Sequence, residues 1–277
     1  MEINNILVPI DFSKCSKNAL LVAIDIAKAT KAKIHMINAV HVHTPHPDFT
    51  GGTLIDAIIV DYETQVKESF KELESEMVEL QEVPHEAERF ISYLTDAIYT
   101  ESKNKDIDLI VMGTRAEHDG MEALLGTRAS DVIEAATVPV LVIPENVTSF
   151  NPSKIGFAAD LGEIKNSKTL KFISDFTKNY HAEVLIFSVA KHPDELSEKE
   201  QKQMEELLSY FDKENASCRT VESGSVKEGI KNFIEAHELD ILVMIPRERS
   251  FLEKLFRKSI TKAIAVETSI PLLSFHE

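Results

Sequence analysis

Short apolar runs alternate with longer amphipathic segments along the first half of the chain. Continuous apolar runs are typical of buried parallel strands, and apolar positions three and four residues apart are typical of helices. The pattern predicts strands over residues 3–10, 33–40, 83–91, 108–113 and 139–144, and helices over 13–30, 55–82, 95–103 and 127–136. This alternation predicts an α/β fold whose mainly parallel sheet carries helices on both faces.

The pattern then repeats in the second half. Three blocks recur in the same order: residues 154–160 resemble 5–11, residues 182–190 resemble 32–40, and residues 239–244 resemble 107–112. From Gly113 to Pro139 the distance is 26 positions, and the same 26 positions separate Ile245 from Pro271. We therefore predict a duplicated domain, with copies at residues 1–147 and 152–277.

Composition narrows the class of protein. Of the 277 residues 43% are hydrophobic, and the net charge is −16, so a general nucleic-acid-binding role is excluded by repulsion from phosphates. Residues 1–148 carry 12 Lys and Arg against 25 Asp and Glu. Two cysteines make no disulfide framework, and neither a signal peptide nor a run of about 20 apolar residues occurs. These features predict a cytoplasmic protein that does not enter a membrane.

Asp11 is the first candidate for chemistry. It follows the first predicted strand directly, and ligands of doubly wound folds bind at the carboxyl ends of the strands. A carboxylate there could accept hydrogen bonds from a nucleoside. It could equally serve only as a cap for the following helix, for which Ser13 is also a candidate. The sequence leaves these two readings of Asp11 open.

A glycine-containing loop is the second candidate. It begins at Gly113 and ends at Gly126, where Thr127 starts a predicted helix. Glycines let a backbone approach phosphate oxygens closely, and a helix N-terminus attracts anions. An ordinary turn between a strand and a helix would also use glycines, so this loop alone does not establish a phosphate site.

Together, the two candidates resemble the universal stress protein family. Its nucleotide-binding members carry a glycine, two residues, a glycine, nine residues, and then glycine with Ser or Thr. The spacing is intact here, at Gly113, Ala116, Gly126 and Thr127, although alanine replaces the middle glycine. The resemblance covers essentially the whole chain. It implies two tandem five-stranded, Rossmann-like domains of the adenine nucleotide α-hydrolase type, with strand order 3-2-1-4-5, forming a pseudo-dimer through their last strands.

The resemblance also implies a binding site for ATP or a related adenine nucleotide, with or without Mg²⁺. Asp11 would lie near the adenine and ribose, Val40 would pack on the adenine, and Gly126 and Thr127 would hold the phosphates. The complete set of residues implied is Pro9, Ile10, Asp11, Val40, Met112, Gly113, Arg115, Ala116, Gly126, Thr127 and Arg128. A methyl group at Ala116 would weaken the site if the backbone there requires a positive φ.

The second copy departs from the glycine pattern. Ile245, Glu248 and Lys258 stand where the first copy has Gly113, Ala116 and Gly126, and only Ser259 keeps its type. A β-branched side chain and a long lysine would obstruct a phosphate loop. We therefore expect a nucleotide site in the N-terminal copy only.

The loop after the second predicted strand contains His41, His43 and His46. Imidazoles at this spacing could bind zinc, but a loop rich in histidine and proline needs no metal, so these residues are low-ranked candidates. No Walker A lysine motif and no GxSxG elbow occurs in the sequence, so no catalytic residue is assigned.

Three functions remain open at this point. The first is a stress-response module that senses ATP and reports it to an unknown protein partner. The alternative is a nucleotide-independent interaction protein that has lost its ligand, and slow ATP hydrolysis is the weakest of the three. A homodimer beyond the internal pseudo-dimer also stays open.

Overall fold

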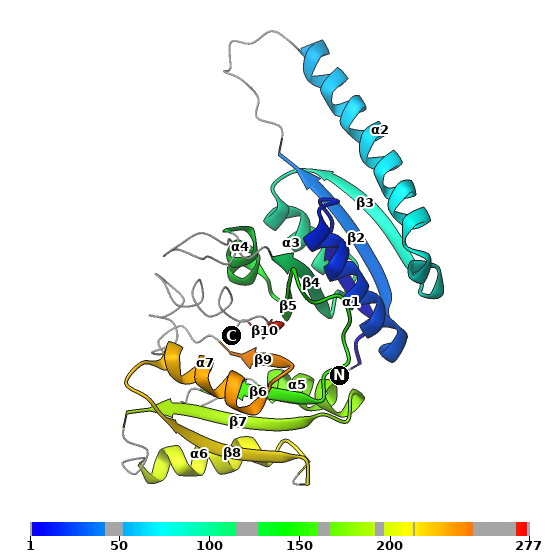
Figure 1. The fold of residues 1–277 in the computed structure, drawn as a ribbon. Coiled ribbons are helices and arrows are strands. Elements are labelled where there is room, and N and C mark those ends of the chain that lie inside the picture. The colour runs from blue at the N-terminus through cyan, green and yellow to red at the C-terminus, as the bar shows by residue number, and fades with distance from the viewer. Residues whose placement is uncertain are drawn as a thin grey trace.

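A computed structural model describes residues 2–41, 52–114, 127–159, 167–191, 197–212, 214–245 and 270–275. The first half contains five strands and their helices (Figure 1). Their bounds are β1 Asn5–Pro9, α1 Lys14–Thr30, β2 Lys33–Val40, α2 Gly52–Glu76, the 3-10 helix η1 Val78–Glu82, β3 His85–Ile91, α3 Leu94–Asn104, β4 Leu109–Thr114, α4 Thr127–Ala135 and β5 Val140–Pro144.

The described part of the second half repeats the sequence of elements. Their bounds are β6 Lys154–Ala158, α5 Ser167–Asn179, β7 Glu183–Ala190, α6 Glu198–Leu208, β8 Ala216–Glu222, α7 Val226–His237, β9 Ile241–Met244 and β10 Leu272–Ser274. The strand ranges predicted for the first half match the structure to within a few residues. Inner strands such as β1 and β5 are continuous apolar runs because they are buried on both faces of the sheet.

All ten described strands form one sheet in the order β3-β2-β1-β4-β5-β10-β9-β6-β7-β8. Each half therefore has the predicted order 3-2-1-4-5. The halves join through an antiparallel pairing of β5 with β10, in which Leu272 lies opposite Val142 and Ser274 opposite Val140. The predicted internal pseudo-dimer is confirmed, and the pairing protects two strand edges that would otherwise be open.

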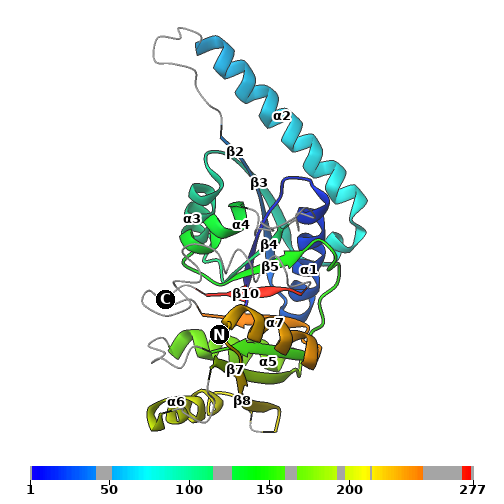
Figure 2. The same ribbon diagram turned by 60° about the vertical axis from the view of Figure 1, so that its left-hand side comes forward.

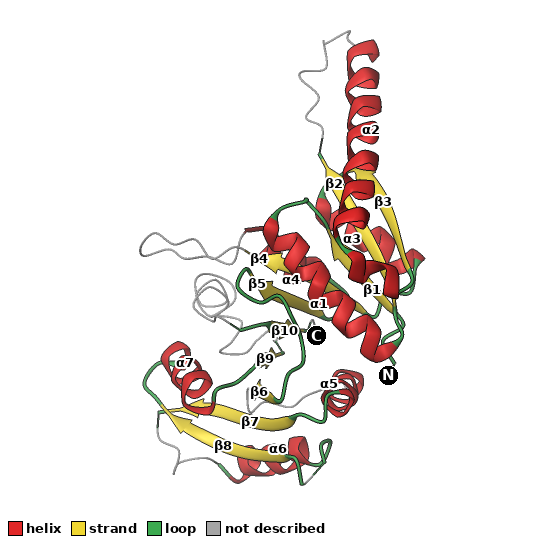
Figure 3. Cartoon of the chain, turned by 45° about the vertical axis from the view of Figure 1, so that its right-hand side comes forward, coloured by secondary structure: helices red, strands yellow, loops and turns green. Residues whose placement is uncertain are grey.

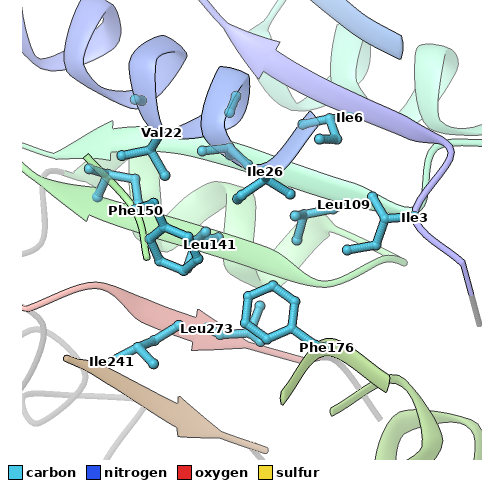
Figure 4. Close-up of a cluster of buried hydrophobic side chains, with 14 of the residues drawn as sticks. Ile3, Ile6, Val22, Ile26, Leu109, Leu141, Phe150, Phe176, Ile241 and Leu273 are labelled. Atoms are coloured by element: carbon cyan, nitrogen blue, oxygen red, sulfur yellow. The ribbon is translucent and has the colours of Figure 1, made fainter. Parts of the chain in front are cut away.

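Helices cover both faces of the sheet. Figure 2 shows α3 and α4 on one face of the first half and α1 on the other, where α2 also packs. In the second half α5 and α6 cover the same face as α1, while α7 covers the face of α3 (Figure 3). Each face has one hydrophobic core that runs through both halves. Leu141 of β5 and Leu273 of β10 lie in the same cluster as Phe150 and Phe176 where the halves meet (Figure 4).

The same polar contact anchors the first strand of each half. The Asp108 carboxylate accepts hydrogen bonds from the backbone N–H groups of Asn4 and Asn5, at 2.8 and 3.1 Å. The Asp240 carboxylate accepts from Ser153 and Lys154 at 2.7 and 2.9 Å. This equivalence supports the duplication independently of the strand order.

One predicted helix is shorter than expected. The sequence predicts a continuous helix over residues 55–82, whereas α2 ends at Glu76 and η1 follows. Met77 breaks the helix with φ −102° and ψ 84°, and Leu80 of η1 is fully buried. The break turns Leu80 into the core before β3 begins. Among the described residues, no helix combines the length and apolarity that crossing a bilayer requires.

Candidate functional site

The candidate site begins where β1 ends, at the turn into α1. The N–H of Ile10 donates to the carbonyl of Ile37 on β2 at 2.7 Å, which extends the pairing one residue beyond β1. Phe12 then adopts a left-handed backbone with φ 61°, an uncommon conformation for a bulky residue. Its ring packs edge-to-face on Phe70 of α2, with 5.1 Å between ring centroids. Packing of this ring helps to hold the unfavourable turn, which directs the chain from the sheet into α1.

Asp11 supports the helix cap without being the cap itself. Ser13 is the N-cap of α1, and its hydroxyl oxygen accepts from the N–H of Ser16. The Asp11 carboxylate accepts hydrogen bonds from both the hydroxyl and the N–H of Ser13. Partial burial alone would raise the pKa of Asp11. The hydrogen bonds from Ser13, a further one from the Ser16 hydroxyl and the nearby charge of Arg128 together lower it. Asp11 is therefore held as a carboxylate with about half of its side chain exposed.

Arg128 connects Asp11 to the second candidate region, the end of the glycine-containing loop where α4 begins. One terminal guanidinium nitrogen of Arg128 lies 3.5 Å from the Asp11 carboxylate, and the Arg128 side chain is 74% exposed. Arg128 is the second residue of α4, so the N-terminus of α4 lies beside the end of β1. The structure thus brings together two predicted site residues that are distant in sequence.

Gly113 has a packing role that the sequence did not indicate. A Cβ atom at Gly113 would lie 2.2 Å from the backbone oxygen of Cys15, in the first turn of α1. Only a glycine lets β4 and α1 approach this closely. Gly113 therefore has a structural reason to be glycine whether or not a ligand approaches its backbone.

The remaining described residues divide by exposure. Pro9, Ile10 and Met112 are buried, so only their backbone groups could meet a ligand, whereas Val40 at the end of β2 is half-buried. Thr127 is the first residue of α4. Arg115, Ala116 and Gly126 lie outside the described residues, so their predicted roles stay predictions.

Sequence reasoning missed two residues beside this turn. Asn38 is a buried polar side chain in β2, and its amide donates to the carbonyl of Ile10 at 2.7 Å. The hydroxyl of Tyr62, on α2, donates to the Asn38 side-chain oxygen at 2.6 Å. Burial raises the pKa of Tyr62, against the lowering effect of Arg89. The signal in the sequence was an asparagine within a mainly apolar strand.

The metal candidates are only partly placed. His41 follows β2, and its ring stacks on Tyr93 with 3.8 Å between ring centroids. His43 and His46 lie outside the described residues. Within the described ranges no three His, Cys, Asp or Glu side chains are grouped as a metal site would require. Zinc binding by the histidine loop stays a prediction.

The corresponding position of the second half is filled. Ile245, which stands where the first half has Gly113, is 4% exposed and belongs to the core beside α5. Glu248, Lys258 and Ser259 lie outside the described residues, as does Asp160, the counterpart of Asp11 in the second half. The described part of the second half therefore differs from the first at the one glycine position that can be compared.

A family model described as the universal stress protein family matches residues 2–144 and again 152–276. A curated relative, universal stress protein A homolog 1 of Coxiella burnetii (strain RSA 493 / Nine Mile phase I), is 31% identical over 144 residues, which cover 52% of this chain and 97% of the relative.

Two solved structures extend the similarity over both halves. A universal stress protein from Archaeoglobus fulgidus DSM 4304 has a TM-score of 0.72 at 18% identity, covering 100% of this chain and 97% of its own. A functionally unknown protein, PA1789, from Pseudomonas aeruginosa PAO1 has a TM-score of 0.62 at 16% identity, covering 99% and 92%. At these identities the structural likeness concerns the fold.

Proposed function

Because the chain belongs to the universal stress protein family, we propose that its first half binds ATP or a related adenine nucleotide beside the carboxyl ends of β1 and β4. The protein would act in the cytoplasm as a sensor that reports nucleotide to a protein partner in the stress response. A single nucleotide per chain is expected, because Ile245 and Lys258 replace two of the glycines in the second half.

The contact between Asp11 and Arg128 supports this proposal most directly. It joins the end of β1 to the first turn of α4, and both side chains remain at least half exposed. An ionised carboxylate can accept from ribose or base, and the guanidinium together with the N–H groups of the α4 N-terminus suits phosphate. A nucleotide could therefore replace the weak 3.5 Å ion pair with contacts to each partner separately.

The roles that we propose for the other residues follow from the family's pattern of residues. We expect backbone groups of Pro9, Ile10, Met112 and Gly113 to contact the nucleoside, and Val40 to pack on the base. Arg115, Ala116, Gly126 and Thr127 would surround the phosphates, with Mg²⁺ as an accompanying ion.

Isothermal calorimetry with ATP and Mg²⁺ on the wild type and on Gly126→Lys tests the proposal. We expect one site per chain and at least a ten-fold loss of affinity in the variant, because a lysine side chain would occupy the phosphate loop. Gly224→Lys is the matched control: a Cβ at exposed Gly224 in the second half meets nothing within 4 Å, so ATP binding should be retained. Absence of binding by the wild type, or two equivalent sites, contradicts the proposal.

A nucleotide-independent interaction protein is the second candidate. It is favoured by the two hydrogen bonds that Asp11 already accepts from Ser13, and by Ala116 in place of the family's glycine. Adenine nucleotide that co-purifies with the protein, detected by absorbance and mass spectrometry, would refute it. Slow ATP hydrolysis, the weakest of the three functions, would be supported only if the wild type turned over ATP faster than a Thr127→Val variant.

A further inference from the structure

Helix α2 is linked to the turn that carries Asp11 in two separate ways, one direct and one through Asn38 of β2. Tyr62 and Phe70 both belong to α2 and are about two helical turns apart, so they lie on similar sides of the helix. Tyr62 reaches the end of β1 through Asn38, and Phe70 packs on Phe12. The residues immediately before and after Asp11 are therefore both connected to α2.

The first connection is a chain of two short hydrogen bonds. The Tyr62 hydroxyl donates to the Asn38 oxygen at 2.6 Å, which fixes the orientation of the Asn38 amide. That amide then donates to the carbonyl of Ile10 at 2.7 Å, while the N–H of Ile10 is bonded to Ile37. Asn38 is only 9% exposed, so losing either bond would leave a polar group with little access to water.

The second connection holds the unusual backbone of the turn. Phe12 has φ 61°, and edge-to-face packing on Phe70 fixes its ring on the α2 side of the sheet. With Ile10 fixed on one side and Phe12 on the other, the backbone at Asp11 has little freedom. The position of Asp11 relative to β4 and α4 depends in this way on where α2 lies.

We infer that Asn38 and Tyr62 are positioning residues for the nucleotide site, and that the site and α2 are energetically coupled through them. This inference rests on the proposed function. If the Tyr62–Asn38 bond favours the arrangement of Asp11 that binds nucleotide, then bound nucleotide must stabilise that bond and α2 by the same factor. Coupling between ligand and α2 is what distinguishes a positioning role from a general contribution to folding.

The test measures ATP affinity by calorimetry and amide hydrogen exchange of α2 with and without ATP, in the wild type and in Tyr62→Phe. We expect ATP to slow exchange in the wild-type α2. Removing the hydroxyl should weaken ATP binding about three- to ten-fold, the equivalent of one hydrogen bond, and reduce the ATP-dependent slowing.

Tyr99→Phe is the matched control. It removes the same hydroxyl from a half-exposed tyrosine on α3, where the oxygen contacts Lys103 instead of the turn, so binding and α2 exchange should stay as in the wild type. Asn38→Leu is the second variant: it should weaken ATP binding at least as much, because the carbonyl of Ile10 loses its donor. Circular dichroism and thermal melting establish that each variant is folded.

The possible failures are distinguishable. Wild-type protein that binds no ATP would defeat the proposed function, and the inference with it. Wild-type protein that binds ATP without any change in α2 exchange, or a Tyr62→Phe variant that binds as tightly as the wild type, would overturn the inference alone. A variant that is less stable but shows unchanged affinity and unchanged ATP-dependent exchange would assign Tyr62 a purely structural role.

Discussion

At the scale of single residues, the turn after β1 combines an exposed charge with a tightly packed backbone. Asp11 projects from this turn, while Phe12 is fixed by Phe70 and Cys15 lies against Gly113. The carboxylate of Asp11 is therefore carried by a backbone segment that is held in place by its neighbours. Rigid placement lowers the cost of binding because little backbone has to be ordered.

Gly113→Ala tests whether the close approach of β4 to the first turn of α1 requires a glycine. The added methyl carbon would lie 2.2 Å from a backbone oxygen, so β4 or the first turn of α1 must move. We expect the free energy of unfolding to fall by about 1–3 kcal/mol, as for overpacked cores. Urea denaturation of the variant checks this value.

Gly224→Ala is the control for Gly113→Ala, because its new Cβ meets nothing within 4 Å. It should leave the unfolding free energy nearly unchanged. Equal stability of the two variants would contradict the packing role of Gly113. Close approach of a ligand would then be the remaining reason for a glycine at this position.

At the scale of elements, β2, β3 and the end of α3 share a charged cluster at the start of the sheet. The two ring nitrogens of buried His35 lie 2.8 Å from a carboxylate oxygen of Glu86 and 3.0 Å from the side-chain oxygen of Asn5. The Glu86 carboxylate also pairs with Lys33 and Lys105. The equivalent of His35 in the second half is Leu185, so this cluster belongs to the first half alone.

The cluster predicts a loss of stability in acid. Hydrogen bonds from Lys33, which has the largest effect, and from Lys105 and His35 together lower the pKa of Glu86 to about 2, against an opposing effect of burial. A carboxyl group with a depressed pKa stabilises the folded state above its unfolded value near 4.5, and this contribution disappears as the pH falls toward 2. Burial also lowers the pKa of His35, so folding loses stability below about pH 6.5 as the unfolded histidine gains a proton.

Free energies of unfolding between pH 7 and pH 2.5, measured for the wild type and Glu86→Gln, check this sign. The variant should be less stable at pH 7 by about 1–3 kcal/mol, and the difference should shrink steadily below pH 4.5. Glu79→Gln, at an exposed carboxyl on η1, should follow the wild type. A difference that stays constant with pH would contradict the assignment of Glu86.

The pattern of apolar positions predicted the helices and strands better than it predicted the roles of the polar side chains buried within them. Strands such as β2 are recognisable because burial on both faces demands a continuous apolar run. His35 and Asn38 interrupt that run, and their partners Glu86 and Tyr62 come from other elements, so spacing within the strand could not identify them. The order of the strands came from the family resemblance, because alternation of strands and helices does not fix it.

The proposed site shows the same limit. Asp11 and Arg128 were both predicted, but their contact depends on where the first turn of α4 lies relative to the end of β1. The role of Gly113 could not be separated from a ligand role, because its neighbour Cys15 is distant in sequence and comes close only in the folded sheet.

At the scale of the whole molecule, the two halves share one sheet and two continuous cores. The junction is a short antiparallel pairing, with Leu141 and Leu273 fully buried on it. Phe150, in the segment that connects the halves, packs on Phe176 and Tyr180 and donates its N–H to Asp25 of α1. Separating the halves would expose all of these apolar side chains together, which favours their unfolding as one unit.

Leu185→Ala tests this cooperativity, because Leu185 lies in β7, away from the junction, and is 3% exposed. Truncating a buried leucine costs about 2–5 kcal/mol. If the halves unfold together, the urea midpoint measured by hydrogen exchange should fall equally for peptides from β2 and from β7.

Leu273→Asp, which places a charge in the shared core, should separate the two midpoints. A β2 midpoint that is unchanged in Leu185→Ala would mean that the halves unfold independently. The paired sheet would then not transmit stability between the proposed nucleotide half and its partner half.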